Sequence, residues 1–219
     1  MHARESQLTG RLRLRHLQEV TEAKAVEMES DAPRFNRLAG DESKPKVFSA
    51  FNLFPTPKEL AARVVALADI RAGHSVLEPS AGTGNLIRAI DETFTDTYSS
   101  GVRITAVEID GPMWHHLSNS DFCMFTNARL ADFLTWESSE RFDRIVMNPP
   151  FKQGRDIKHI NRARQFLKAG GRLVVICANG PRQREKLQPE AAQWIELPAG
   201  SFKSEGTNVN AAIAIFTGE

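Results

Sequence analysis

The stretch LEPSAGTGNL, Leu77–Leu86, decides the fold. A short apolar run, Ser75 to Leu77, leads into it, and a helical pattern from Asn85 to Phe94 leaves it. A strand, a glycine turn and a helix form the first unit of a doubly wound α/β sheet, whose ligands lie over the carboxyl ends of the strands. Gly82 and Gly84 let the backbone of this turn approach a ligand closely.

The same turn argues against ligands that carry phosphates. A dinucleotide fingerprint needs glycine where Ile87 stands, and a phosphate-binding Walker loop needs a Lys-Ser/Thr ending that is missing here. The carboxylate of Glu78 would repel a pyrophosphate, whereas it would attract a cation. We therefore expect a ligand with a cationic centre.

Two further strand ends add to this description of the ligand. Glu108 ends the next predicted strand, Val102–Val107, where a carboxylate can accept both hydroxyls of a ribose. Asp132 and Phe133 pair an acceptor for an exocyclic amine with an aromatic plane, as an adenine would need. Adenine, ribose and a cationic centre without phosphates describe S-adenosyl-L-methionine. Taken singly, an acid at a strand end is more often a solvated loop residue than a ligand-binding one.

Strand and helix patterns alternate through the rest of the chain. Thr56 is expected as the N-cap of a helix, with Pro57 at its first position and Glu59 completing a capping box. Asp156 is expected to cap a later helix that Gly170 and Gly171 close. Further strands are predicted at 128–130, 144–147 and 172–177, and a terminal hairpin from 193–197 and 211–216. This alternation predicts a mostly parallel sheet with helices on both faces.

The N-terminal region differs in composition from the remainder of the chain. Residues 1–46 are predicted to form a helical arm and a linker, and residues 47–219 the α/β domain. No apolar run is long enough to span a bilayer, so we expect no membrane partner and a cytoplasmic location. Cys123 and Cys177 match no metal-ligand spacing and are too few for a disulfide framework, so neither a metal site nor a disulfide is expected.

Charge is distributed unevenly although the formal net charge is only +1. Residues 141–186 hold twelve Lys and Arg against three Asp and Glu, a balance of +9, and the remainder of the chain carries −8. So basic a block favours a polyanionic partner. The alternative is an ordinary solvated helix face without a partner.

Five motifs together carry a family resemblance. In order and spacing, FPTPKELAARVV, LEPSAGTGNL, AVEID, ADFL and NPPF resemble the S-adenosylmethionine-dependent amino-methyltransferases with an N-P-P-F/Y motif, in particular the adenine N6-specific DNA methyltransferases. The resemblance covers about residues 48–216 and implies a Rossmann-like, mostly parallel seven-stranded sheet with a terminal antiparallel hairpin. By the resemblance, Phe54, Thr56 and Pro57 flank the methionine end of the cofactor. Those that wrap it are Glu78, Pro79, Ser80, Ala81, Gly82, Gly84 and Asn85. Glu108 then holds the ribose, and Asp132 with Phe133 the adenine.

The NPPF motif, Asn148, Pro149, Pro150 and Phe151, suits methyl transfer to an amine conjugated to a ring. The side-chain oxygen of Asn148 and the carbonyl of Pro149 can each accept one amino hydrogen and aim the nitrogen lone pair at the methyl group. The two prolines stiffen the loop, and Phe151 offers a stacking face for a planar target. The alternative is a turn that merely closes a buried strand.

The basic block suggests which substrate the motif serves. Lys152, Arg155 and Lys158 follow NPPF directly and are candidate nucleic-acid contacts. Lys203, with Phe202, Ser204 and Thr207, is a candidate to close over the target base or phosphates, unless this hairpin loop is simply mobile. Adenine N6 in DNA is the leading substrate. The alternatives are adenine N6 or guanine N2 in RNA, a protein glutamine, and a cofactor-binding subunit without enzymatic activity.

Sequence specificity needs a separate source in this interpretation. The family members with defined sites usually carry a target-recognition domain, for which we expect no room between Phe151 and Glu219. Specificity is then relaxed, supplied by a partner protein, or read by the N-terminal arm with Arg11, Arg13 and Arg15. Trp136, His115, His116 and His159 are interpreted as structural or surface residues, and the sequence does not specify an oligomeric state.

Overall fold

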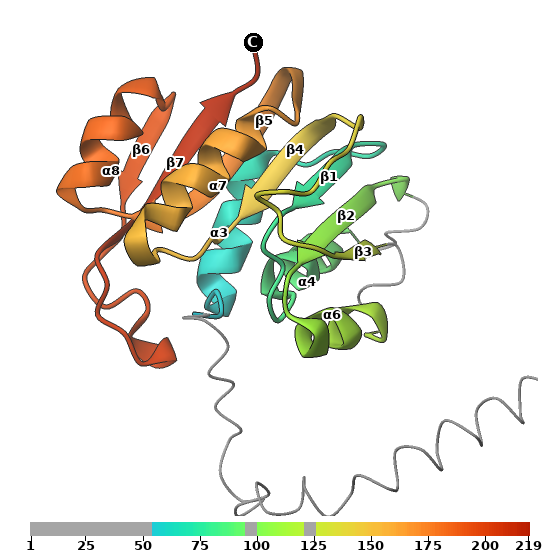
Figure 1. Ribbon diagram of the computed structural model, residues 1–219, viewed down its shortest axis with the longest axis horizontal. Helices are drawn as coiled ribbons and strands as arrows, with labels where there is room; N and C mark the ends of the chain where they lie inside the picture. Colours follow the sequence, from blue (N-terminus) through green and yellow to red (C-terminus); the bar gives the residue numbers. More distant parts are fainter. Residues whose placement is uncertain (1–53, 95–99, 121–125) are drawn as a thin grey trace, which may run out of the picture. The chain divides into compact units, whose positions relative to one another are not determined.

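The computed structural model describes residues 54–94, 100–120 and 126–219. Its strands form one seven-stranded mixed sheet in the order β3-β2-β1-β4-β5-β7-β6 (Figure 1). The strands are β1 (Ser75–Glu78), β2 (Arg103–Glu108), β3 (Thr126–Leu130), β4 (Phe142–Met147), β5 (Leu167–Ala178), β6 (Gln193–Glu196) and β7 (Ala211–Thr217). β1 to β5 pair in parallel, whereas β7 runs antiparallel to both β5 and β6. The predicted doubly wound sheet with a terminal antiparallel hairpin is confirmed.

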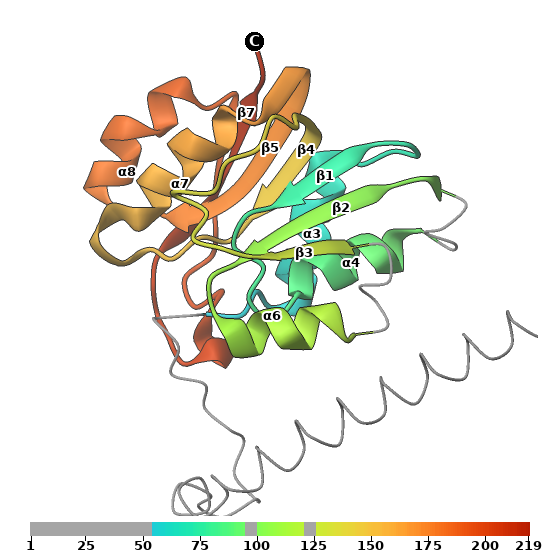
Figure 2. The same cartoon turned by 45° about the vertical axis from the view of Figure 1, so that its right-hand side comes forward.

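Helices cover both faces of this sheet (Figures 1 and 2). They are α3 (Lys58–Ala68), α4 (Asn85–Thr93), α6 (Gly111–Ser118), α7 (Arg155–Arg164) and α8 (Pro181–Lys186), with 3-10 turns η2 (Lys152–Gly154), η3 (Gln188–Glu190) and η4 (Lys203–Glu205). Because successive strand residues point to opposite faces, Val76 packs with α3 and α4, whereas Leu77 packs with α7. The result is a core in two layers, one on each side of the sheet.

Two helix boundaries differ from the sequence predictions. α3 has Pro57 as its N-cap with no side-chain cap, so Thr56 lies before the helix and is not its cap. α7 follows Gly154, whose φ of 71° is left-handed, and Asp156 is buried within the first turn instead of capping it. The helix ends at Arg164, and Gly170 and Gly171 belong to β5. A Cβ on Gly171 would lie 2.8 Å from the Lys168 carbonyl oxygen, so close backbone contact requires this glycine.

Some predictions fall outside the described residues. They are the N-terminal arm and linker at 1–46, with Arg11, Arg13 and Arg15, and Cys123. Cys177 is buried in β5, and burial raises the pKa of its thiol. Across 54–94, 100–120 and 126–219, no helix is long and apolar enough to cross a membrane.

Candidate functional site

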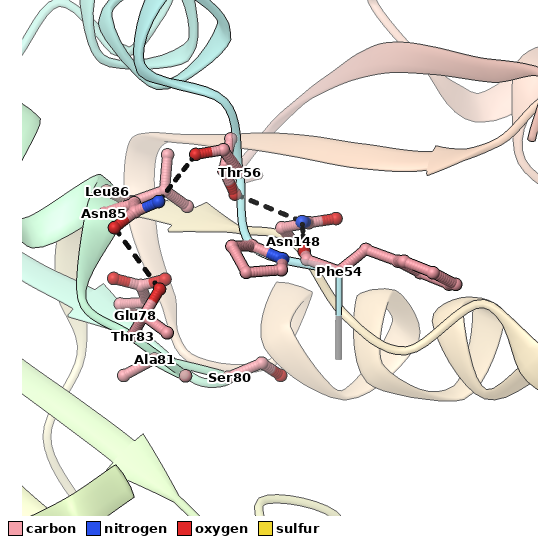
Figure 3. A pocket seen from close by; sticks show the side chains of 11 residues that line it. Phe54, Thr56, Glu78, Ser80, Ala81, Thr83, Asn85, Leu86 and Asn148 are labelled. Carbon is pink, nitrogen blue, oxygen red and sulfur yellow. Dashed lines mark hydrogen bonds between the residues drawn. The ribbon is translucent and has the colours of Figure 1, made fainter. Parts of the chain in front are cut away.

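The site forms where β1 and β4 lie side by side. These strands pair in parallel, with Val76 opposite Arg144 and Leu77 opposite Ile145, so their carboxyl ends reach the same edge of the sheet. A pocket opens there (Figure 3). Eight of its lining residues were predicted from the sequence: Phe54, Thr56, Glu78, Ser80, Ala81, Gly82, Asn85 and Asn148. Three others were not: Pro55, Thr83 and Leu86.

The side-chain amide of Asn148 is held in one orientation. Its Nδ2 donates to the carbonyl oxygen of Phe54 at 3.0 Å and to Oγ1 of Thr56 at 3.1 Å. A carbonyl oxygen can only accept, so the nitrogen must face Phe54 and the oxygen must face away. Both amide hydrogens are thereby used within the protein. Oδ1 remains as an acceptor for a substrate donor.

A second pair of hydrogen bonds ties the glycine turn to the same segment. Nδ2 of Asn85, at the start of α4, donates to the carbonyl oxygen of Thr56 at 2.8 Å. Oγ1 of Thr83 donates to Oδ1 of Asn85 at 3.2 Å. Thr56 therefore connects the two loops, its backbone bonding to the turn after β1 and its hydroxyl to the motif after β4 (Figure 3).

Glu78 brings a carboxylate to the pocket in an environment that disfavours its charge. The residue is only 2% exposed, and its Oε2 is buried without a hydrogen-bond partner among the described residues. Burial, reinforced by the nearby charge of Glu108, raises the pKa of Glu78 well above its ordinary value. No basic side chain lines the described pocket. A cationic ligand would supply the missing opposite charge.

Glu108 stands behind the glycine turn instead of lining the pocket. Its Oε2 accepts from the backbone N–H of Gly82 at 2.6 Å, and its Oε1 accepts from that of Asp110 at 2.8 Å. The carboxylate thus fixes the turn to the end of β2. Each carboxylate oxygen keeps further acceptor capacity, so these two bonds are compatible with a contact to a ribose. That contact stays a prediction.

The predicted adenine residues lie after β3, outside the lining of the pocket. Asp132 is half-buried, and its Oδ1 accepts from the N–H of Leu134 at 3.0 Å. Phe133 is 2% exposed and packs against Trp136, Phe166 and His159, with ring centroids 5.8 to 6.3 Å away. Its ring therefore belongs to the core beneath α7, and contact with an adenine stays a prediction.

The rest of the NPPF motif is largely shielded from solvent, and its phenylalanine contacts the C-terminal hairpin. Pro149 is buried, and Pro150 and Phe151 are half-buried. The Phe151 ring meets that of Phe202 edge to face, with centroids 6.3 Å apart. Phe202 is fully buried, so the prediction that it closes over a target base is wrong. Phe202 instead packs against the Phe151 ring and supports it.

The other predicted residues flank the site or lie apart from the pocket. Gly84 is the left-handed N-cap of α4, and Pro79 is buried in the same turn. Lys152, Lys158 and Lys203 are exposed. Arg155, the first residue of α7, is half-buried. Of the residues interpreted as structural or surface residues, His159 is buried, Trp136 packs in the same core layer, and His115 and His116 are exposed.

Comparison with known families identifies this arrangement. The model of the methyltransferase small domain matches residues 43–196. The chain belongs to the methyltransferase small domain family. Membership agrees with the seven-stranded sheet, the glycine turn after β1 and the motif after β4.

Methyltransferases of several kinds are similar to parts of the chain. The Type II methyltransferase M.TthHB8I of Thermus thermophilus is 38% identical over 96 residues, 44% of this chain and 20% of the relative. The tRNA1(Val) (adenine(37)-N6)-methyltransferase of Glaesserella parasuis is 29% identical over 90 residues, 39% of this chain and 36% of the relative. The crystal structure of a putative RNA methyltransferase from Pyrococcus horikoshii shares the fold, with a TM-score of 0.58, 21% identity, and coverage of 80% of this chain and 91% of that one. The chain thus spans only a minor part of the two curated relatives.

A methyltransferase of this class takes its methyl group from S-adenosylmethionine, and the pocket fits that cofactor. The compound is a cation without phosphates, which suits the unpaired buried oxygen of Glu78. Gly82 and Gly84, with φ of 52° and 79°, bring the backbone of the turn close to the pocket. When bound, the cofactor supplies an activated methyl group on a positively charged sulfur.

Proposed function

We propose that this protein is an S-adenosylmethionine-dependent N-methyltransferase of nucleic acid, acting on adenine N6 in DNA. The observation that carries the proposal is the fixed amide of Asn148 at the end of β4, beside the pocket. Its oxygen is kept free to accept a hydrogen, which is what an exocyclic amine offers.

The residues of the NPPF motif would promote methyl transfer by orienting the target amine. Oδ1 of Asn148 and the carbonyl of Pro149 each accept one hydrogen of the target amine, and its lone pair is turned toward the methyl group. Phe151, braced by Phe202, stacks on the flipped base. No strong base is needed, because the sulfonium is already an activated leaving group, and the excess proton passes to water. The transfer is direct, with no covalent intermediate on the protein.

Adenine N6 in RNA is the second candidate, and the tRNA-modifying relative supports it. Guanine N2 and a protein glutamine offer similar NH2 groups, but the basic block favours a polyanionic substrate. A cofactor-binding subunit without activity is the alternative of another class. The intact geometry of Asn148 argues against it, since a subunit that transfers no methyl group needs no fixed acceptor. A partner protein would supply sequence specificity if methylation is selective.

The test is methyl transfer from tritiated S-adenosylmethionine to separate pools of duplex DNA, single-stranded DNA, RNA and protein. Nucleoside analysis of the labelled pool then identifies the product. We expect label in N6-methyladenine from DNA. Label in RNA adenine would favour the second candidate, and label confined to N2-methylguanine or to protein would refute the adenine assignment.

Asn148→Ala is the decisive variant, and Asn119→Ala is its matched control. Asn119 is exposed at the end of α6, so its loss should leave transfer unchanged. Asn148→Ala should lose about 100-fold or more in kcat while it still binds the cofactor in calorimetry. Wild-type protein that binds cofactor and nucleic acid but never transfers the methyl group would instead identify the non-enzymatic subunit.

A further inference from the structure

The twelve bases of residues 141–186 divide into two groups in the folded chain. Seven have hydrogen bonds or ion pairs within the protein: Arg141, Arg144, Arg162, Arg164, Lys168, Arg172 and Arg184. Arg144 and Arg172, for example, donate to carbonyl oxygens at the end of α3. These seven charges already have partners within the protein, so the charge of the block alone overstates the surface free for another molecule.

The side chains of the other five bases have no hydrogen bond or ion pair with any described residue. They are Lys152, Arg155, Lys158, Arg182 and Lys186, and all but the half-buried Arg155 are exposed. The Nε of Arg155 is itself buried without an acceptor. All five lie on η2, α7 and α8, the elements that follow the NPPF motif in the chain. The unpartnered charges of the block thus lie on three elements that all come after the NPPF motif.

Contacts between α7 and α8 make these elements one surface. Nε2 of Gln183 donates to both carboxylate oxygens of Asp156, at 3.2 and 2.9 Å, in a buried pair that joins the two helices. Arg182 lies against Gly154, since a Cβ built there would be 3.0 Å from Nη1 of the guanidinium. Figures 1 and 2 both show α7 and α8 side by side, with the start of α7 at the edge reached by the end of β4.

We infer that Lys152, Arg155, Lys158, Arg182 and Lys186 form the phosphate-backbone contact of the nucleic-acid substrate. We call these five residues the α7–α8 basic surface. The inference rests on the proposed function and extends it to α8, which the sequence did not single out. Among the acids near α7 and α8, Glu185 is exposed, Glu190 and Glu196 are paired with Arg164 and Arg184, and Asp156 is buried, so the balance of the surface stays positive. Long, exposed ammonium and guanidinium groups without internal partners suit phosphates, which position a substrate without reading its sequence.

The test compares two double variants of the full chain that lose the same charge. Arg182→Gln with Lys186→Gln removes two members of the α7–α8 basic surface. Arg164→Gln with Arg184→Gln removes two partnered bases, whose exposed ion pairs with Glu190 and Glu196 contribute little to stability. Dissociation constants for one duplex DNA and one structured RNA are measured by fluorescence anisotropy over a series of salt concentrations.

We expect the first double variant to bind more weakly and to lose about 2 from the slope of log K against log salt, about 1 for each phosphate contact. The control should keep the wild-type slope. At saturating substrate kcat should be unchanged, with the loss confined to KM. The nucleic acid that shows the larger slope change is the one the surface fits.

The inference would be overturned if both double variants kept the wild-type salt slope. It would also be overturned if both lost the same amount of slope. Methyl transfer to nucleic acid by wild type would then still stand, so the proposed function would survive. Wild-type protein that methylates protein and binds neither nucleic acid would overturn both.

Discussion

The hydroxyl of Thr56 is expected to set the rate of methyl transfer without contacting the substrate. It accepts one of the two amide hydrogens of Asn148, and the Phe54 carbonyl accepts the other. Thr56→Val removes the hydroxyl acceptor with little change in side-chain shape. The Asn148 amide is then held by its bond to the Phe54 carbonyl alone. Its second N–H hydrogen loses its acceptor within the protein, and the residue is half-buried.

The magnitude follows from the value of one hydrogen bond. A flipped amide would set Oδ1 against the Phe54 carbonyl oxygen, two acceptors facing each other, so the productive orientation remains preferred. The loss is therefore limited to about 0.5 to 1.5 kcal/mol, the net contribution of one hydrogen bond. Because about 1.4 kcal/mol corresponds to a factor of ten, kcat should fall about 2- to 10-fold. Asn148→Ala, which removes the acceptor altogether, should cost far more.

Steady-state kinetics and calorimetry separate this effect from damage to the cofactor pocket. The Thr56 carbonyl still accepts from Asn85 in the variant, so the Kd for S-adenosylmethionine should not change. Thr56→Ser restores the hydroxyl and should recover kcat. If Thr56→Val keeps full kcat, or if serine fails to rescue it, the hydroxyl does not orient Asn148.

Three further variants test other parts of the structure. Glu78→Gln should bind the cofactor more weakly, yet in thermal denaturation without cofactor it should lose less stability than wild type as the pH rises above the ordinary carboxyl range. The reason is that the raised pKa of Glu78 makes its ionisation cost stability as pH rises, and glutamine has no such titration. Asp143→Asn should lower stability in urea by about 1 kcal/mol at neutral pH with kcat intact. Lys168 and the Ser75 N–H and hydroxyl outweigh burial and hold the pKa of Asp143 low, so its contribution is present at neutral pH and lost only in strong acid. Phe202→Ala should cost about 3 to 5 kcal/mol in denaturant unfolding and raise KM for nucleic acid through Phe151, whereas wild-type KM would contradict the bracing contact.

The sequence was most informative where local rules apply. The turn after β1 was predictable because Gly82 and Gly84 follow an apolar run, and the outer hairpin because its strands are separated by turn residues. The side-chain chemistry of the site was only partly predictable, since it depends on residues distant in the chain. Phe54 lies 94 positions before Asn148, and no local pattern says that its carbonyl fixes the amide.

Burial was the other quantity that local patterns left open. Phe202 sits among polar turn residues, and the sequence therefore suggested an exposed ring, but the hairpin folds it into the core. Glu108 was predicted from its place at a strand end. Its bond to the N–H of Gly82, however, depends on the turn after the neighbouring strand, 26 positions from it.

The order of strands explains why cofactor pocket, acceptor and basic surface come together. β4 pairs with β1 although about 60 residues separate them, because β2 and β3 are laid down on the other side of β1. The direction of the chain reverses at this point, and the crevice between the two strand ends is where an open α/β sheet binds its ligands. The segments that come after β4 must then border the cofactor site, and here they are NPPF, η2 and the start of α7. We therefore expect a base held at Asn148 to have its phosphates beside α7, and beside α8 because Gln183 and Asp156 join the two helices.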